Sequence, residues 1–292
     1  MKLAAYTTLG LGGPAHELWT ACNEEEAILA VRRAKRSGHE LRILGGGSNL
    51  VVADAGVDAA VLRLTEAETK LDERGHHVLA LVAAGTVWDD WVRYTVERGW
   101  PGLECLSGIP GQVGGTPIQN VGAYGQEVAE TVTRLRVLDR HAETIDWLPA
   151  SACAFGYRTS RFKGEDADRL LVLAVEFALP TLPSSGLPAR PLYPELARAL
   201  ALSDGEQPSL ARIRETVLAL RKSKSMVLDP ADENGRSCGS FFTNPFVSAA
   251  DLERIATRAG EKPPSFPQAD GRSKVPAHRA SASRRAAASS RS

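Results

Sequence analysis

Glycines and prolines alternate with apolar residues in the segment Gly108–Gly125, GIPGQVGGTPIQNVGAYG. Because proline fixes φ and apolar side chains attach a loop to a core, we expect this segment to be rigid, unlike a linker. Glycine has no Cβ, so peptide N–H groups in such a segment can approach phosphate oxygens closely. The segment therefore predicts a nucleotide cofactor site. The alternative is a buried crossover loop that needs positive φ.

A second glycine turn, LGGGSN at Leu44–Asn49, directly follows a predicted strand at Leu41–Leu44. A glycine turn at a strand end is a second candidate phosphate loop, and a plain tight turn is the alternative. It lacks both the GxGxxG spacing and the lysine of a P-loop. Neither a Rossmann unit nor a phosphoryl-transfer site is therefore supported.

Basic residues form two further clusters. In YRTSRFK, residues 157–163, Arg158 lies between apolar neighbours, where a guanidinium can stabilise developing negative charge. The alternative is a surface ion pair. In RKSKS, residues 221–225, the charges either bind an anion or complement the dipole of the helix that ends there.

The motif GSFFTNP, residues 239–245, places Ser240 between a glycine and two phenylalanines. Ser240 can act as a proton donor in an apolar pocket, or it can bond its own backbone at the start of a strand. No His, Asp or Lys is close in sequence, so a Ser-His-Asp hydrolase has no support. A redox-linked proton transfer fits better.

Metal chemistry has little support. His76 and His77 are adjacent in a predicted strand and point to opposite faces. The four cysteines are widely separated and form no CxxC pair, which favours reduced thiols and a cytosolic location. They are Cys22, Cys105, Cys153 and Cys238. We identify no signal peptide and no apolar segment long enough to span a bilayer.

The 292 residues contain 35 basic and 35 acidic side chains, so no global field favours nucleic acid or an anionic membrane. At 43% hydrophobic content the chain can form cores for two or three domains. Helical and strand patterns are mixed, which predicts an α+β fold. Helices are expected at 24–37, 87–96, 209–220 and 248–260, and strands at 41–44, 78–84, 134–138, 143–147 and 170–179. Pro180–Pro191 is a composition break, where we place a domain boundary.

The motifs, in their order, resemble those of the UDP-N-acetylenolpyruvoylglucosamine reductase family. LYPEL suggests the subclass with an added tyrosine loop. The resemblance extends from the N-terminus to about Pro276 and is carried by TTLGLGGPA (7–15), LGGGSN (44–49), PGLECLSGIPGQVGGTPIQNVGAYG (101–125), FGYRTSRFK (155–163), LYPEL (192–196), RKSKSMVLDP (221–230) and GSFFTNP (239–245).

The resemblance implies an FAD-binding module of the vanillyl-alcohol-oxidase type, made of two α+β subdomains, and a third α+β domain that binds substrate. The expected domains are 1–64 and 65–182 for FAD, 183–276 for substrate, incomplete here, and a disordered tail at 277–292. The matching FAD segments contain Leu44, Gly45, Gly46, Gly47, Ser48, Asn49, Ser107, Gly108, Ile109, Pro110, Gly111, Gly114, Gly115, Gln119, Asn120, Gly122, Ala123, Tyr124 and Gly125.

The resemblance also implies the reaction. NADPH reduces a non-covalently bound FAD, which passes hydride from N5 to C3 of UDP-N-acetylglucosamine enolpyruvate, a peptidoglycan precursor. By the family's motif, Arg158 stabilises the enolate and Ser240 protonates C2. Tyr193, Lys224 and Asn244 match substrate-binding positions. We expect a cytosolic monomer that binds neither nucleic acid nor membrane.

The C-terminus departs from the family. After KVPA, residues 274–277, the chain reads HRASASRRAAASSRS, whose Ala, Ser and Arg content predicts disorder. A frameshifted or truncated end is the preferred interpretation, and a basic nucleic-acid tail is the alternative. No residue matches the family's C-terminal catalytic glutamate. We therefore expect FAD binding with reduced or absent turnover, so a noncatalytic FAD or nucleotide binder is the alternative function.

Overall fold

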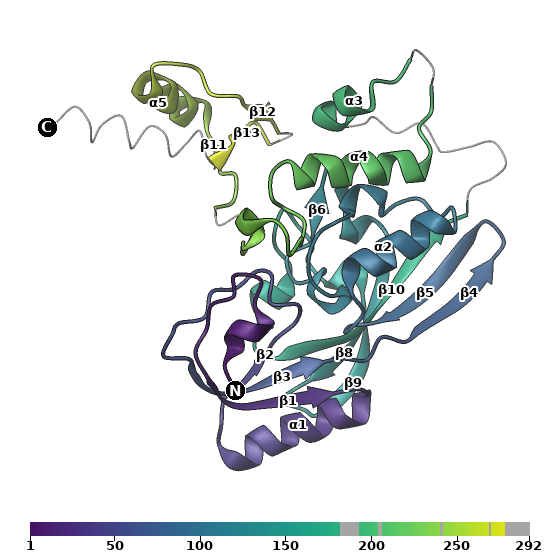
Figure 1. Cartoon of the computed structure of the whole chain (residues 1–292), viewed down its shortest axis with the longest axis vertical. Coiled ribbons are helices and arrows are strands. Elements are labelled where there is room, and N and C mark those ends of the chain that lie inside the picture. The colour runs from purple at the N-terminus through teal and green to yellow at the C-terminus, as the bar shows by residue number, and fades with distance from the viewer. Residues whose placement is uncertain (182–192, 204–205, 240–241, 269, 278–292) are drawn as a thin grey trace, which may run out of the picture. The chain divides into compact units, whose positions relative to one another are not determined.

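A computed structural model describes residues 1–181, 193–203, 206–239, 242–268 and 270–277. The chain divides into two compact units, Met1–Gly239 and Ser240–Ser292 (Figure 1). Among the described residues no helix is both long and apolar enough to cross a membrane. The predicted tail lies almost entirely at 278–292, outside the described residues, as does most of the composition break.

The first sheet of the larger unit has three parallel strands in the order β1 (Ala15–Ala21), β3 (Val57–Leu64) and β2 (Leu41–Ile43). Helix α1 (Glu24–Ser37) lies alongside this sheet (Figure 1). It buries a face of small residues, Ala27, Ala30, Val31 and Ala34. A narrow face of this kind allows the helix to pack closely on the strands.

The ends of α1 follow from its sequence. The Asn23 side chain accepts the N–H of Glu26 at 2.8 Å, which satisfies one of the unpaired donors at the start of the helix. At the other end Gly38 adopts the left-handed conformation at φ 72°, where glycine has no Cβ penalty. The predicted helix is confirmed at both ends.

The second sheet is antiparallel, in the order β4-β5-β10-β8-β9. Its strands are β4 (Thr69–Arg74), β5 (His77–Ala83), β10 (Leu170–Pro180), β8 (Val132–Asp139) and β9 (Thr144–Pro149). The central strand β10 is buried along most of its length, as expected where both faces are covered. The predicted hairpin and the strand at 170–179 are confirmed.

Helix α2 (Trp88–Glu97) covers one face of this sheet with two buried tryptophans. The rings of Trp88 and Trp91 lie 6.2 and 5.8 Å from that of Phe177 on β10. A separate cluster joins the two sheets, because Leu62 of β3 packs in one core with Leu171 of β10. The two sheets are therefore parts of one folded unit.

Short elements complete the larger unit. β6 (Gly122–Ala123) pairs with β7 (Gln126–Glu127). Single 3-10 turns occur at Leu3–Tyr6, Glu104–Leu106, Val113–Gly115, Val128–Glu130, Ala150–Ala152, Arg161–Lys163 and Glu233–Gly235. Several of them lie within or beside the predicted cofactor segments.

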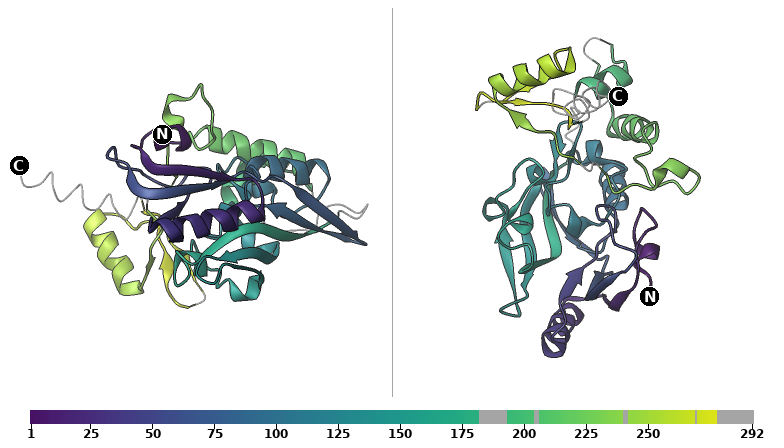
Figure 2. Two further views of the ribbon diagram at one scale, coloured as in Figure 1. Left: turned by 90° about the horizontal axis from the view of Figure 1, so that it is seen from below. Right: turned by 90° about the vertical axis from the view of Figure 1, so that its left-hand side faces the viewer.

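Helices α3 (Pro194–Leu200) and α4 (Leu210–Lys222) also belong to the larger unit, and α4 lies beside α2 in both views of Figure 2. Leu196 and Ile213, one from each helix, share a buried cluster with Cys105. The contacts thus divide the chain at Gly239, although its composition changes near residue 183. The assignment of 183–276 to substrate binding stays a prediction.

The smaller unit contains α5 (Ala249–Ala259) and a three-stranded sheet. Ser248 caps α5 by accepting the N–H of Asp251 at 3.1 Å, as its sequence indicates. The strand order is β11-β13-β12, from β11 (Phe246–Val247), β12 (Phe266–Pro267) and β13 (Ser273–Lys274). Both units mix helices with strands, and the predicted α+β class is confirmed.

Candidate functional site

The two predicted glycine segments lie directly against each other. A Cβ on Gly46 would lie 2.6 Å from Cα of Gly111, well inside van der Waals contact. Beside them, Ser48 Oγ donates a hydrogen bond of 3.0 Å to the Pro110 carbonyl. Glycine at position 46 therefore permits the backbone contact between the segments.

Two side-chain amides extend this contact. Asn49 Nδ2 donates to Gln119 Oε1 at 3.2 Å. Gln112 Nε2 donates to the carbonyls of Leu64 and Gly85, at 3.3 and 3.0 Å. Gln112 thereby ties the second segment to the ends of β3 and β5. No local pattern singled out this residue, since its partners are 48 and 27 positions away.

Neighbouring glycines in the second segment have different surroundings. A Cβ on Gly114 would lie 2.5 Å from Cβ of Ala84, so this glycine allows the loop to pack on the end of β5. A Cβ on Gly115 would have no heavy atom within 4 Å. Packing within the protein therefore requires glycine at position 114. It does not require glycine at position 115, where an added Cβ would contact no heavy atom.

Gly115 lines a cavity of about 290 Å³ at the junction of the two sheets. Both glycine segments contribute to it, and β2, β3 and β10 provide apolar walls. The lining residues are Leu41, Arg42, Ile43, Leu44, Gly45, Leu64, Ala84, Gln112, Gly114, Gly115, Ile118, Arg140, Phe162, Ala167, Asp168, Leu170, Leu171 and Val172.

Arg140 supplies a cation to this cavity. Its Nη2 donates to the Leu41 carbonyl at 2.6 Å, which holds the side chain at the start of β2. Burial lowers the pKa of the guanidinium from its usual value. A partly desolvated cation beside an apolar cavity is suited to a polar group on a mainly apolar ligand.

The first residue of the long glycine segment is anchored by an ion pair. The N–H of Gly108 donates to Asp89 Oδ1 at 2.6 Å, and Arg214 Nη1 and Nη2 donate to the two oxygens of Asp89 at 2.7 and 2.8 Å. Burial acts to raise the pKa of Asp89, but Arg214 and the Gly108 N–H outweigh it and lower the pKa. The pair joins α2, α4 and the glycine segment.

The last residues of the glycine segment lie near two predicted substrate residues. The ring of Tyr124 meets that of Tyr193 edge-on at 6.0 Å, and Lys224 Nζ lies 6.0 Å from the Tyr124 ring. Lys224 also forms an ion pair of 2.5 Å with Glu195 in the first turn of α3. Burial raises the pKa of Tyr124.

Arg221 interacts electrostatically with Tyr124 and lies beside the start of the glycine segment, since a Cβ on Gly108 would lie 3.5 Å from its Nε. Burial lowers the pKa of its guanidinium, and Nη2 donates to the Met226 carbonyl at 2.8 Å. Its buried Nε has no hydrogen-bond partner among the described residues. A buried donor without a partner is costly, so it marks a position where a ligand oxygen would be favourable.

Arg158 is held in a tight turn. It has φ 57° and its Nη2 donates to the Gly122 carbonyl at 3.1 Å, which connects it to the glycine segment. Gly156 and Thr159 close the turn with two backbone hydrogen bonds. A non-glycine residue at positive φ is strained, and such strain often occurs at functional positions.

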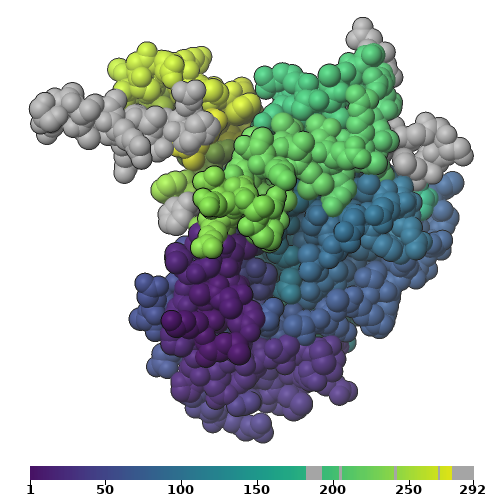
Figure 3. All heavy atoms as spheres, in the orientation of Figure 1, coloured from purple at the N-terminus to yellow at the C-terminus, as the bar shows by residue number. Residues whose placement is uncertain are grey.

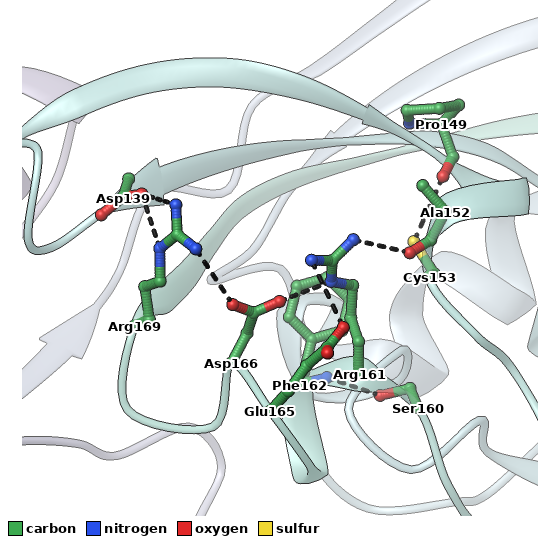
Figure 4. A network of polar contacts seen from close by, with 10 residues as sticks. All are labelled: Asp139, Pro149, Ala152, Cys153, Ser160, Arg161, Phe162, Glu165, Asp166 and Arg169. Atoms are coloured by element: carbon green, nitrogen blue, oxygen red, sulfur yellow. Dashed lines mark hydrogen bonds and ion pairs between the residues drawn. The ribbon is translucent and has the colours of Figure 1, made fainter.

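Figure 4 shows the ion pairs that stabilise the chain beyond this turn. Arg161 donates to Asp166 at 2.5 Å and to the Ala152 carbonyl at 2.8 Å. Arg169 joins Asp166 to Asp139, and its hydrogen bond lowers the pKa of Asp139 to about 2. The basic cluster is therefore divided: Arg161 is structural, whereas Arg158 reaches the glycine segment.

Cys153 lies in the same network and is fully buried. Burial raises the pKa of its thiol to about 11, so it is not a thiolate near neutral pH. The four cysteines carry thiols and form no disulfide. In the described part of the chain, no three His, Cys, Asp or Glu residues are grouped to hold a metal ion.

The remaining predicted residues differ in what the structure shows of them. Ser240 lies outside the described residues. Asn244 belongs to the smaller unit, where its Oδ1 accepts the N–H of Ala277 at 3.0 Å. Asn120 is buried, and its side chain bonds to Glu127 at 2.7 Å and to two backbone groups. Its amide therefore makes hydrogen bonds within the protein, and its predicted contact with FAD stays a prediction.

A buried Glu104–Gln126 pair, not singled out by its sequence, supports the start of the glycine segment. Gln126 Nε2 donates to Glu104 at 2.6 Å, and Gln126 Oε1 accepts the N–H of Cys105 at 2.8 Å. Ser107 Oγ donates to the Glu104 carbonyl at 2.6 Å. These bonds fix the 3-10 turn at 104–106 from which the segment begins.

Comparison with known proteins identifies the class of this site. A family model described as "FAD binding domain" matches residues 18–147, which include both glycine segments. This part of the chain thus matches an FAD-binding domain, as the family resemblance implies.

The relatives are more specific. A UDP-N-acetylenolpyruvoylglucosamine reductase of Thermobifida fusca is 49% identical over 284 residues, covering 95% of this chain and 78% of the relative. One of Streptomyces avermitilis is 48% identical, covering 94% and 75%. The crystal structure of the Thermus caldophilus reductase superposes with a TM-score of 0.61 at 28% identity, covering 94% of this chain and 86% of that one. The chain belongs to the UDP-N-acetylenolpyruvoylglucosamine reductase family.

Proposed function

We propose that this chain reduces UDP-N-acetylglucosamine enolpyruvate to UDP-N-acetylmuramate in peptidoglycan precursor synthesis, with NADPH as the hydride donor. The observation that carries the proposal is the contact between the segments at 44–49 and 107–125 beside a cavity of about 290 Å³. Arg158, the proposed catalytic cation, is bonded to the second of these segments. The relatives' names supply the substrate.

The residues at the cavity fit FAD. Gly45 and Gly115 line it without side chains, so a cofactor can approach their backbone closely, although the Gly115 N–H itself already donates to the Gln112 carbonyl at 3.0 Å. Leu41, Leu170 and Leu171 provide apolar walls for a flat ring system. The unoccupied space at a Gly115 Cβ is explained if the cofactor approaches that backbone. When bound, FAD supplies the acceptor and donor of hydride.

Arg158 is assigned to the developing negative charge on the substrate. A guanidinium presents a planar fork that matches a carboxylate or enolate, and such a preorganised donor in a dry site lowers a barrier by roughly 3–4 kcal/mol. Nη2, one prong of this fork, donates to the Gly122 carbonyl at 3.1 Å, which holds the guanidinium against the cofactor segment. Ser240 is assigned to proton donation, a contribution that is typically about 10²–10⁴-fold.

Tyr193 is assigned to the substrate diphosphate, Lys224 to the substrate carboxylate or the NADPH region, and Asn244 to a further substrate contact. Tyr193, Lys224 and Arg221 surround Tyr124 in the larger unit, so three polar groups lie close to the end of the glycine segment. The unpaired Arg221 Nε adds a donor for a ligand oxygen. The proposal places the chain in the cytosol as a monomer, with FAD bound at 1–64 and 65–182.

The test is anaerobic reduction of the FAD-loaded protein, followed by substrate. NADPH is expected to bleach the flavin band, and the enolpyruvyl substrate is then expected to restore it with formation of UDP-N-acetylmuramate. Bleaching without product identifies a binder rather than a reductase and overturns the proposal.

A further inference from the structure

The N-terminal motif TTLGLGGPA has no part in the proposed chemistry, yet it packs on a cofactor segment. A Cβ on Gly47 would lie 1.8 Å from the Tyr6 carbonyl oxygen and 2.9 Å from Cα of Thr7. The N–H of Thr8 donates to the Gly47 carbonyl at 3.1 Å. The turn formed by the motif therefore lies directly against the segment at 44–49.

The Thr8 side chain points to a second part of the chain. Thr8 Oγ1 makes a short hydrogen bond to the Ser237 carbonyl, 229 positions away, and lies 3.4 Å from the Gly47 carbonyl. A hydroxyl has one proton to donate, and Gly47 already accepts the Thr8 N–H. The hydroxyl proton therefore goes to Ser237. Figure 3 shows N-terminal residues (purple) adjoining residues of the 230s (light green).

The segment at Ser237 is itself ordered by local contacts. Ser237 Oγ accepts the N–H of Gly239 at 3.0 Å, and Gly239 has φ 79°, a conformation that other residues rarely adopt. A Cβ on Gly239 would lie 4.0 Å from Asn49 Oδ1. Ser237–Gly239 is thus placed beside the same cofactor segment that Thr8 contacts. Ser240 is the next residue in the chain.

We propose that Thr8 is a positioning residue that fixes the chain leading to Ser240 to the cofactor segment. The inference rests on the proposed function, since proton donation by Ser240 is part of it. Thr8 bonds to Gly47 through its backbone and to Ser237 through its side chain, so one residue sets the spacing between them. Proton transfer depends steeply on such placement, because a displacement of about 1 Å can cost roughly 10²-fold in rate.

Cys238 provides a local readout that is independent of turnover. Its thiol is half-buried and adjoins Ser237, whereas Cys105 and Cys153 are buried and Cys22 is exposed. In a Cys22→Ser background, Cys238 is therefore the first thiol expected to react with an aromatic disulfide reagent. The rate of that reaction reports on release of the 237–239 segment.

The test compares Thr8→Val, which removes the hydroxyl at similar size, with Thr8→Ser, which keeps it. Thr8→Val is expected to raise the Cys238 rate about three- to ten-fold, the size of one lost hydrogen bond, and Thr8→Ser less than about two-fold. Thr7→Val is the matched control, because Thr7 Oγ1 bonds within the turn, to Leu11 at 2.8 Å. It is expected to leave the rate unchanged.

Equal rates for Thr8→Val and Thr7→Val would overturn the proposal. Simultaneous reaction of Cys105 and Cys153 in Thr8→Val would also overturn it, because the hydroxyl would then support the whole fold. In the FAD-loaded protein, Thr8→Val is expected to bleach with NADPH at the wild-type rate and to reoxidise with substrate at least about ten-fold more slowly. Absence of bleaching in the wild type refutes the proposed function alone, since the thiol rates still test the role of Thr8.

Discussion

Gly46 and Gly115 are expected to respond differently to the same substitution. In Gly46→Ala the new Cβ would meet Cα of Gly111 at 2.6 Å, whereas carbon atoms pack at about 3.5–4.0 Å. The two glycine segments must therefore separate by about 1 Å. Overpacking of this kind costs about 1–3 kcal/mol, which for a unit of this size lowers Tm by about 2–12 °C.

Gly115→Ala places the same methyl group where no heavy atom lies within 4 Å. We expect the free energy of unfolding to change by less than about 0.5 kcal/mol, as at an unconstrained position. Because Gly115 lines the cavity assigned to FAD, its methyl group is expected to weaken FAD binding about ten-fold, equivalent to about 1.4 kcal/mol.

The assay is thermal unfolding of the FAD-free protein followed by circular dichroism, together with FAD titration followed by quenching of flavin fluorescence. Gly46→Ala should lose both stability and affinity, and Gly115→Ala affinity alone. An unchanged Tm in Gly46→Ala would refute the close contact of the segments. Wild-type affinity in Gly115→Ala would refute the explanation of its open surroundings.

The other predictions concern ionisable side chains. Asp89→Asn should lower the free energy of unfolding, measured in urea, by about 1–3 kcal/mol. Asp89 pairs with Arg214, whose side chain is 12% exposed, but the Asp89 side chain is itself 34% exposed, so solvent partly screens the pair. Asp90→Asn is the control: Asp90 pairs with the exposed Arg93, and its loss should change the free energy of unfolding by less than about 0.5 kcal/mol. Because the pKa of Asp89 is lowered on folding, its contribution to stability is present above the unfolded pKa of about 3.9 and is lost as pH falls through the folded pKa. The difference in unfolding free energy between wild type and Asp89→Asn should therefore shrink below about pH 4. A difference that persists to about pH 2 would contradict this. With the thiol pKa of Cys153 raised to about 11 by burial, iodoacetamide at pH 8 should leave Cys153 unmodified in the folded chain, as checked by peptide mass spectrometry. Arg158→Lys should keep FAD affinity within about two-fold. It should slow flavin reoxidation by substrate, measured in stopped flow, about 10²–10³-fold, because lysine lacks the planar fork of the guanidinium. An unchanged rate of reoxidation would remove Arg158 from the mechanism.

Much of the local structure could be predicted from the sequence because its causes are local. Asn23 and Gly38 define the two ends of α1, and alternation predicts β8, β9 and β10. Both glycine segments were predicted as backbone built for close approach. Their mutual contact was not, because residues 46 and 111 meet only after two sheets pack together.

The cavity shows the same limit. Arg140 reaches it by bonding to Leu41, 99 positions away, and no neighbouring residue indicates that partner. Gln112 and Glu104 likewise act through partners distant in sequence: Gln112 bonds to the Leu64 carbonyl, and Glu104 accepts from Gln126. Nothing in the residues next to them indicates these partners. At Pro180–Pro191 the composition indicates a loop, but it carries no information on which core α3 and α4 then join.

Non-covalent binding of FAD by this chain is the claim on which the rest depends. The direct measurement is the visible absorption spectrum of the full chain after incubation with FAD and gel filtration, followed by denaturation and ultrafiltration. We predict about one FAD per chain, with all of the flavin released into the filtrate. A colourless protein, or flavin that stays with the denatured chain, would contradict the account.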